Sequence, residues 1–196
     1  MNKRSGIESR KRIIDAAMSV FSRHGYAKAN IRVIAKIAGI SVGGVYLYFK
    51  NKEELYKSLI DDRMRDMGSK SEIIAGRAES ATEALSDFFK LHLENALKHK
   101  EFILLHIREH RFSFGIDKKR AFLRQQTKLI ENIIIRGIRA GEFRRCNTGE
   151  IANIIMGTLR GIILSMAVET DVTITSKQLS EFVLKGLLKG NRKKAG

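Results

Sequence analysis

The stretch Asn30–Lys52, NIRVIAKIAGISVGGVYLYFKNK, decides how the first part of the chain folds. Four apolar residues in its first half recur at i, i+3, i+4 and i+7, the spacing of one face of an α-helix. They are Ile31, Ile34, Ala35 and Ala38. Gly39 comes directly after them, where a chain that leaves a helix often needs a positive φ. The pattern predicts a short helix that ends at Gly39.

A second short helix is expected after a tight turn. Ser41 can cap it, because a serine oxygen accepts a hydrogen bond from the backbone of the first helical turn. Its apolar residues again share one face, and they are Val42, Val45, Tyr46 and Phe49. Two helices joined by a short turn that contains glycine form a helix-turn-helix, whose second helix can enter the major groove of DNA.

The sequence around this motif resembles the amino-terminal domain of TetR-type transcriptional regulators over about residues 7–67. The residues that carry the resemblance are Arg12-Ile13-Ile14-Asp15-Ala16-Ala17, Phe21, Gly25-Tyr26, Ile34-Ala35, Ala38-Gly39-Ile40-Ser41, Gly43, Tyr46, Phe49 and Lys52. The resemblance implies a DNA-binding head, a helical body that holds a small effector, and pairing of two copies of the chain.

Charge is concentrated at the start of the chain. The formal net charge of the 196 residues is +16, and residues 1–52 contain 11 Lys/Arg against 2 Asp/Glu. The front quarter therefore carries more than half of the net charge. A basic surface of this kind favours a polyanionic partner.

The remainder of the chain repeats the 3.6-residue period of apolar residues, and proline is absent. We therefore predict an all-α protein of about nine helices. An N-terminal helix-turn-helix domain of three helices is expected over residues 7–67. A C-terminal helical domain for effector binding and dimerisation is expected over residues 68–196, with Gly68–Ser80 as the joint.

The expected DNA contacts lie on the two short helices and beside them. Missing side chains at Gly43 and Gly44 would let backbone amides approach DNA, and tyrosine hydroxyls and rings suit phosphates and thymine methyls. The resemblance implies a cap from Asn30, a phosphate contact from Lys52, and a base or phosphate contact from Arg32. The full set is Asn30, Arg32, Ser41, Val42, Gly43, Gly44, Tyr46, Tyr48 and Lys52.

The resemblance also implies an apolar pocket among the fourth to seventh helices. Candidate lining residues are Phe88, Phe89, His92, Phe102, Leu105, His106, Phe122 and Leu129. Each of them alone is equally typical of a packed core. Basic residues in the same region, including Arg108, Arg111 and Arg124, suit a small apolar or amphipathic effector with a polar or anionic end. A fatty acyl compound and a planar aromatic both fit that description.

Residues 151–168 contain only Asn153 and Arg160 as strongly polar members. Their length permits a membrane span, but a central arginine is costly in a bilayer, so a buried helix is expected and no membrane partner. Gly157 and Gly161 are four apart and would let another helix approach closely. The resemblance implies that the last two helices form a homodimer interface. Its expected residues are Ile154, Gly157, Gly161, Leu164, Phe182 and Leu187.

The histidines raise a second hypothesis. His106-Ile107-Arg108-Glu109-His110 matches H-x-x-E-H, a zinc-peptidase motif, and two histidines four apart on a helix can bind a metal. No other catalytic signature accompanies the motif. We therefore expect no enzyme, no bound metal and no other cofactor. Cys146 is the single cysteine, which excludes an intramolecular disulfide.

These features together predict a cytoplasmic, ligand-responsive transcriptional regulator. We expect a homodimer that binds a palindromic operator in double-stranded DNA, acts as a repressor, and is released by a small hydrophobic effector. The alternative is a nonspecific nucleic-acid-binding architectural protein, which would use the same basic front without a pocket or a palindrome.

Overall fold

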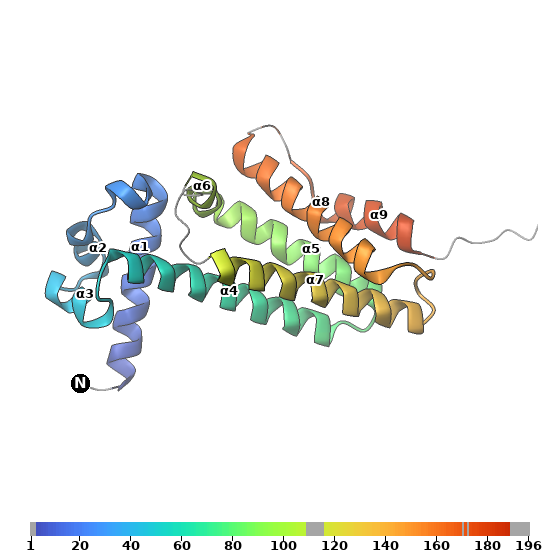
Figure 1. The fold of residues 1–196 in the computed structure, drawn as a ribbon, viewed down its shortest axis with the longest axis horizontal. Coiled ribbons are helices and arrows are strands. Elements are labelled where there is room, and N and C mark those ends of the chain that lie inside the picture. Colours follow the sequence, from blue (N-terminus) through green and yellow to red (C-terminus); the bar gives the residue numbers. More distant parts are fainter. Residues whose placement is uncertain (1–2, 109–115, 170, 172, 189–196) are drawn as a thin grey trace, which may run out of the picture. The chain divides into compact units, whose positions relative to one another are not determined.

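The computed structural model describes residues 3–108, 116–169, 171 and 173–188. In this part of the chain the regular elements are nine α-helices, which confirms the predicted all-α class. They are α1 (Lys3–Lys28), α2 (Ile31–Ala38), α3 (Val42–Tyr48), α4 (Lys52–Arg77), α5 (Ala81–Lys98), α6 (Lys100–Arg108), α7 (Ile116–Arg139), α8 (Thr148–Val168) and α9 (Ser176–Leu187) (Figure 1).

The chain divides into two compact units, each with its own hydrophobic core. Unit 1 comprises Met1–Asp66 and His99–Lys119, and unit 2 comprises Met67–Lys98 and Arg120–Gly196. Unit 1 thus includes α6, which the sequence-based limits assign to the second domain. The limits 7–67 and 68–196 remain a prediction about domain function.

The segment Gly68–Ser80 is not the loop-like joint that the sequence suggested. α4 continues as a helix to Arg77, and only residues 78–80 separate it from α5. The reason is a packing face: Met67, Ser71 and Ala75 are all buried at a spacing of four residues. Burial of this stripe holds residues 68–77 in the helix despite their two glycines and two serines.

Unit 1 is built on α1, which packs against α2 and α6. Ile13, Ala17 and Phe21 of α1 are fully buried there. α1 is interrupted at Gly25, whose φ of 74° and ψ of 166° are not helical. Because L-residues with a side chain rarely adopt a positive φ, glycine is the residue that this break requires.

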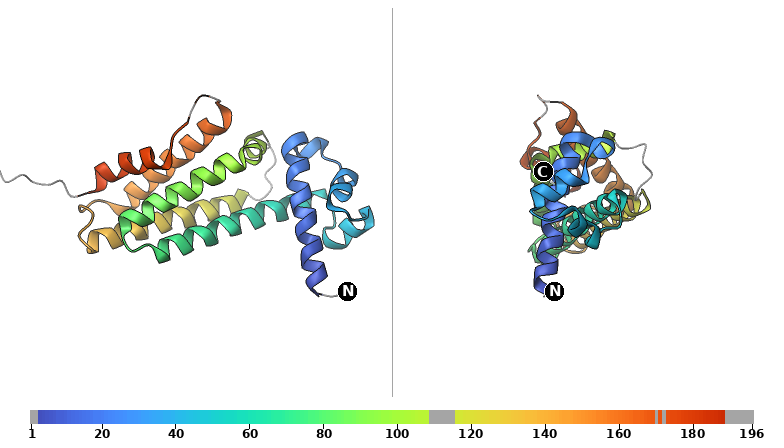
Figure 2. Two further views of the ribbon diagram at one scale, coloured as in Figure 1. Left: turned by 180° about the vertical axis from the view of Figure 1, so that it is seen from behind. Right: turned by 90° about the vertical axis from the view of Figure 1, so that its left-hand side faces the viewer.

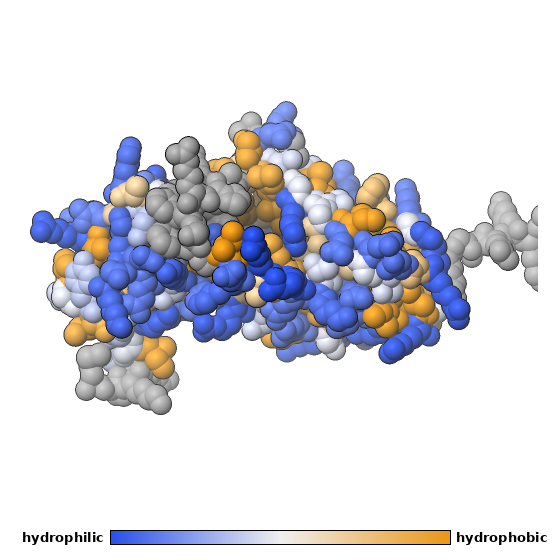
Figure 3. Space-filling model, viewed as in Figure 1, coloured by the Kyte–Doolittle hydropathy of each residue, from blue (hydrophilic) through white to orange (hydrophobic). Residues whose placement is uncertain are grey.

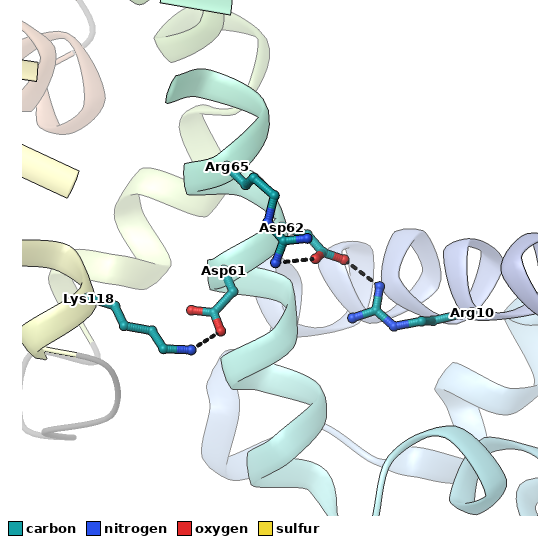
Figure 4. A network of polar contacts seen from close by, with 5 residues as sticks. All are labelled: Arg10, Asp61, Asp62, Arg65 and Lys118. Atoms are coloured by element: carbon teal, nitrogen blue, oxygen red, sulfur yellow. Dashed lines mark hydrogen bonds and ion pairs between the residues drawn. The ribbon is translucent and has the colours of Figure 1, made fainter. Parts of the chain in front are cut away.

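Ion pairs on α4 add polar contacts to unit 1. Arg10 of α1 donates to Asp62 of α4, with 2.7 Å between Arg10 Nη1 and Asp62 Oδ2, and Lys118 of α7 pairs with Asp61 (Figure 4). The Arg10 guanidinium also lies 5.5 Å from the centroid of the Phe49 ring. Arg10 therefore joins α1 to α4 within unit 1.

In unit 2, α5 packs against α8 and α9. Figure 1 and the left view of Figure 2 show these helices from opposite sides. Phe88 and Phe89 of α5 are fully buried in this core. The turn after α7 packs closely against the end of α7. A Cβ on Gly137 would lie 2.3 Å from the ring of the buried Phe143, so the contact leaves no room for a side chain at Gly137. Gly141, with φ of 78°, reverses the chain between them.

Glu142 in this turn caps α5 from a distance of about sixty residues in the chain. Its carboxylate accepts hydrogen bonds from the backbone amides of Ala81 and Thr82, each at 2.9 Å. Ser80 supplies the local cap, accepting from the Glu83 amide at 3.0 Å. Burial alone would raise the pKa of Glu142, but these hydrogen bonds and the charge of Arg136 lower it overall.

Candidate nucleic-acid interface

The helix-turn-helix has the local geometry that its sequence predicts. The Asn30 side chain caps α2 by accepting from the Arg32 amide at 2.8 Å. Gly39 adopts the left-handed conformation with φ of 64° and ψ of 39°, and its N–H reaches the last carbonyls of α2. α2 and α3 meet at an angle of 95°. The turn therefore places α3 at a steep angle to α2. The residues next to each helix supply the hydrogen bonds that cap its ends.

The two glycines of α3 have different structural roles. Ser41 caps the helix by accepting from the Gly44 amide at 3.0 Å, and a Cβ on Gly44 would lie 2.5 Å from Ile40 Cγ2. Gly44 is therefore required by the packing of the turn itself. Gly43 is exposed and has no heavy atom within 4 Å of the position of a Cβ. Nothing in the described structure requires a glycine there.

One side of α3 is apolar and open to solvent. Val45 is buried in the core of unit 1, whereas Tyr46 is 49% exposed and Leu47 is 78% exposed. Val42 is exposed on the same side, and Tyr48 is half-buried against the core of unit 1. Apolar side chains displayed on a short helix of a basic domain suit contact with thymine methyls in a major groove. Arg32 of α2 is also exposed.

Lys52 at the start of α4 is engaged within the protein. Its Nζ donates to the carbonyl oxygens of Ala27 and Ala29, at 3.1 and 3.2 Å, and lies 4.8 Å from the centroid of the Tyr26 ring. A cation is favoured beside the free carbonyls at the end of a helix, here α1. This contact explains why a lysine occupies the first turn of α4, where the α4 dipole alone disfavours it. One of the three ammonium hydrogens remains for a phosphate.

A helix pair of this geometry, presenting one open face from a basic domain, defines a helix-turn-helix DNA-binding protein. Residues 13–59 match the family model described as "Bacterial regulatory proteins, tetR family". The chain is a TetR-type transcriptional regulator.

Relatives of full length support the same assignment. The chain is 28% identical over 181 residues to a fatty acid metabolism regulator protein of Bacillus subtilis, covering 89% of this chain and 93% of the relative. Among solved structures it is similar to the fatty acid degradation regulator FadR from Bacillus halodurans, with a TM-score of 0.76, 28% identity, and coverage of 90% of this chain and 98% of that one.

It is also similar to the transcriptional regulator FadR from Bacillus subtilis in complex with stearoyl-CoA. The TM-score is 0.73 and the identity 28%, with 92% of this chain and 98% of the other covered. Both solved structures span unit 2 as well as the DNA-binding unit. The similarity therefore extends to the body that the family model does not reach.

The described residues expected to line an effector pocket are divided between the two units. Phe88, Phe89 and His92 are buried in unit 2, and Leu129 is half-buried against the same core. Phe122 is half-buried on α7, whereas Phe102 packs against the core of unit 1. The side chains of Leu105 and His106 lie outside the described residues.

A buried polar cluster, Ser71, His92 and Gln126, lies in unit 2 where α4, α5 and α7 each contribute one member. Ser71 Oγ donates to the Met67 carbonyl at 2.9 Å and lies 3.3 Å from His92 Nε2. The donor in the second contact depends on the tautomer of His92: because the Ser71 proton is directed to Met67, Nε2 donates to Ser71 Oγ when Nε2 carries the ring proton.

His92 is uncharged in this cluster at neutral pH. Burial lowers the pKa of His92 from 6.5 to about 4, and a weaker effect of the Gln126 side chain opposes it. The ring lies 4.2 Å from that of Phe88, between centroids. An imidazole with this pKa offers hydrogen bonds without carrying charge into an apolar core.

Gln126 is fully buried, and neither atom of its amide forms a well-aligned hydrogen bond with the described residues. An unsatisfied buried polar group costs about 1–3 kcal/mol, and native proteins leave few of them. Sequence reasoning missed Gln126 and Ser71. The signal was available, because Gln126 lies one helical turn before Ile130 on the buried stripe of α7.

α8 has apolar residues on two opposite sides. Ala152, Ile155 and Leu159 are buried in the core of unit 2. The other side is exposed at spacings of three and four residues, and its members are Ile154, Gly157, Gly161, Leu164 and Val168. Phe182 of α9 is 72% exposed, whereas Leu187 is buried in the protomer and does not reach such a surface.

The glycines on these faces have no packing partner among the described residues. Nothing lies within 4 Å of a Cβ placed on Gly157, Gly161 or Gly186. α8 is long and apolar enough to cross a membrane by length and composition alone, with a mean hydropathy of 1.7, although a core helix of a soluble protein passes the same test. On the side drawn in Figure 3, isolated apolar patches lie among hydrophilic side chains.

The histidines take other roles where they are described. His92 contacts Ser71, and His99 Nε2 lies 3.1 Å from Arg63 Nη1. His110 lies outside the described residues, as does the side chain of His106. Within the described part, no group of three His, Cys, Asp or Glu side chains is placed to hold a metal ion.

Proposed function

We propose that this regulator is a homodimeric repressor that binds a palindromic operator and is released by a small amphipathic effector. The observation that carries the DNA-binding assignment is the open side of α3. Leu47 and Tyr46 stand exposed on a helix whose opposite side is anchored by Val45 in the core. A hydrophobic surface of this kind is unfavourable in water and becomes useful in a major groove.

The exposed side of α8 supports the homodimer. A stripe with alternating spacings of three and four residues is the pattern by which two helices pack along their length. Small residues at Gly157 and Gly161 permit close approach of a second helix, and Phe182 of α9 adds a large apolar contact on the neighbouring helix. Two heads would then face half-sites separated by about 34–36 Å, or a multiple of that distance.

The buried polar cluster supports the effector. The Gln126 amide, which forms no well-aligned hydrogen bond with the described residues, and the neutral His92 could receive one uncharged polar group, such as the carbonyl of an acyl thioester, within an otherwise apolar core. The stearoyl-CoA bound by the FadR relative has that chemistry. We therefore infer a long-chain acyl compound, with a coenzyme A thioester as the leading candidate.

Release from DNA requires only that the effector favour the dimer that does not bind the operator. A differential of about 2.7 kcal/mol lowers operator affinity roughly a hundredfold. Because the coupling is reciprocal, operator DNA must weaken effector binding by the same factor.

The test is footprinting of the full-length protein on genomic fragments, with and without stearoyl-CoA. One protected inverted repeat, lost on adding stearoyl-CoA, is expected. Leu47→Ala and Tyr46→Ala should change which sequences are protected, while Leu97→Ala on the exposed surface of α5 should not. Uniform coating of every fragment would favour the architectural alternative, and activation of a promoter reporter would contradict the repressor assignment.

A further inference from the structure

A basic groove lies between α7 and α8 in unit 2. Its volume is about 420 Å³, and it is lined from both helices. The charged and amide side chains around it are Arg120, Arg124, Lys128, Glu131, Asn153 and Arg160. Leu123 forms an apolar part of its wall, and Thr127 adds a hydroxyl.

Three of the four cations in this basic groove have no acidic partner among the described residues. Lys128 Nζ pairs with Glu131 at 2.8 Å, which satisfies the carboxylate of the groove. The hydrogen bond from Lys128 lowers the pKa of Glu131, more than its partial burial raises it, so the pair stays ionised at neutral pH. Arg120, Arg124 and Arg160 form no ion pair or hydrogen bond with the described residues.

The spacing of the cations along α7 destabilises the helix, because like charges on successive turns repel each other. Arg120, Arg124 and Lys128 follow one another at i, i+4 and i+8 on α7, so like charges adjoin on successive turns. Arg160 approaches from α8 with the same sign. All four cations line the same groove, and only Lys128 has an acidic partner among the described residues. A bound anion would relieve the repulsion.

Arginine is also the side chain that recognises phosphate best. Its planar guanidinium donates two parallel hydrogen bonds to one phosphate, and it keeps its charge at every physiological pH. The volume of the groove is within the range of small-molecule sites. Several guanidinium groups around one hollow suit a ligand with more than one phosphate.

We propose that the basic groove binds the diphosphate and 3′-phosphate of a coenzyme A thioester, the anionic end of the effector. This inference rests on the proposed function, because it takes an acyl thioester as the effector. Thr127 and Asn153 would donate to phosphate or ribose oxygens, and Leu123 would contact the nucleoside. The groove thereby distinguishes a coenzyme A thioester from a free fatty acid of the same chain length.

The experiment measures binding to the full-length protein by calorimetry. The ligands are stearoyl-CoA, its 3′-dephospho form, stearate and ATP. The test variant is Arg124→Gln/Arg160→Gln, and the matched control is Arg139→Gln, an exposed arginine on α7 outside the groove. Melting curves and operator footprints without ligand verify that each variant is folded and still binds DNA.

We expect the double variant to bind stearoyl-CoA at least tenfold more weakly than the wild type, with a shallower dependence on salt, while Arg139→Gln is unchanged. Stearate affinity should be equal in all three proteins, and removal of the 3′-phosphate should weaken binding to the wild type. Equal stearoyl-CoA affinity in wild type and double variant would overturn the groove assignment and leave the proposed function standing.

Other results would refute the proposal differently. ATP binding as tightly as stearoyl-CoA would show a general polyphosphate site and overturn the coenzyme A assignment. Loss of operator binding by the ligand-free double variant would identify the groove as a DNA contact. If neither stearoyl-CoA nor stearate bound the wild type, the acyl effector of the proposed function would itself be wrong.

Discussion

The Lys52 ammonium lies 4.8 Å from the centroid of the Tyr26 ring, and the same group closes the end of α1 through the carbonyls of Ala27 and Ala29. One cation thus connects the first turn of α4 to the last turn of α1. The contact gives Lys52 a role in the stability of the DNA-binding unit, beside the phosphate contact that the family resemblance implies for it.

Lys52→Ala should therefore change two quantities together. The free energy of unfolding should fall by about 1 kcal/mol, because the helix-end and cation–π contacts are lost. The slope of log binding constant against log salt should decrease by about one unit per head if the remaining hydrogen contacts a phosphate. Urea unfolding and salt-dependent anisotropy measure the two. Lys90→Ala of α5 is the control, and neither quantity should change in it. If Lys52→Ala lost stability but kept the wild-type salt slope, the role of Lys52 would be intramolecular only.

Gly43→Ala should separate stability from DNA binding. The new methyl group meets open space in the protein and removes a glycine from a helix, so the unit should become more stable by up to about 1 kcal/mol. Operator affinity should nevertheless fall, because the methyl occupies the position proposed for DNA. Gly44→Ala is the counterpart: its methyl would meet Ile40, so it should melt earlier. A Gly43→Ala protein with wild-type operator affinity would remove Gly43 from the interface.

Gly157→Leu should release monomers. The described part of the protomer has room for the side chain, but a second α8 packed against this position would clash with it, at a cost of about 1–3 kcal/mol. Analytical ultracentrifugation over a range of concentrations measures the shift. Gly76→Leu is the control, since Gly76 also lies exposed in a helix with nothing near its Cβ. Equal sedimentation of both variants as stable dimers would place the interface elsewhere.

His92 should make the protein sensitive to mild acid. Its pKa is about 4 in the fold, below the value of 6.5 expected when unfolded, so the unfolded chain binds more protons between these values. Stability should accordingly fall as the pH decreases from 6.5 to 4, by roughly 3 kcal/mol in all. Urea titrations at several pH values should show this slope in the wild type and in His24→Gln. In His92→Gln the slope should be lost, and its persistence would assign the acid sensitivity to another group.

Glu142→Gln should destabilise unit 2 at neutral pH and weaken its response to stronger acid. The carboxylate accepts from two α5 amides, and its pKa is lowered overall by these bonds. A lowered pKa means that its contribution is complete above about 4.5 and is lost as the pH falls further through the folded value. Hydrogen exchange of the first turn of α5 should accelerate in the variant at pH 7. Unchanged protection there would show that Ser80 alone suffices as the cap.

The parts of the fold that the sequence predicts well are those determined locally. Asn30, Gly39 and Ser41 each act on backbone groups within five positions of themselves, so their caps and turn can be inferred from spacing alone. The buried stripes of the long helices follow from the same period. Local chemistry leaves few alternatives at such positions.

The parts that could not be predicted depend on contacts between distant segments. Nothing in the sequence near Lys52 indicates that its ammonium meets carbonyls 23 and 25 positions away. The different roles of Gly43 and Gly44 emerge only when Ile40 is placed. The apolar period of α5 places His92 on the buried face of that helix. Its neighbours Ser71 and Gln126 could not be predicted, because they are set by the packing of α4 and α7 against α5.

The unpartnered apolar stripe of α8 has a consequence for gene dosage. In the proposed homodimer each protomer would gain stability by burying this stripe, and dilution would reverse the pairing. Where the protein is scarce enough for monomers to dominate, the number of occupied operators would rise with the square of protomer abundance. A twofold change in expression would then alter occupancy about fourfold, so the α8 surface would sharpen the cell's response to the amount of regulator it makes.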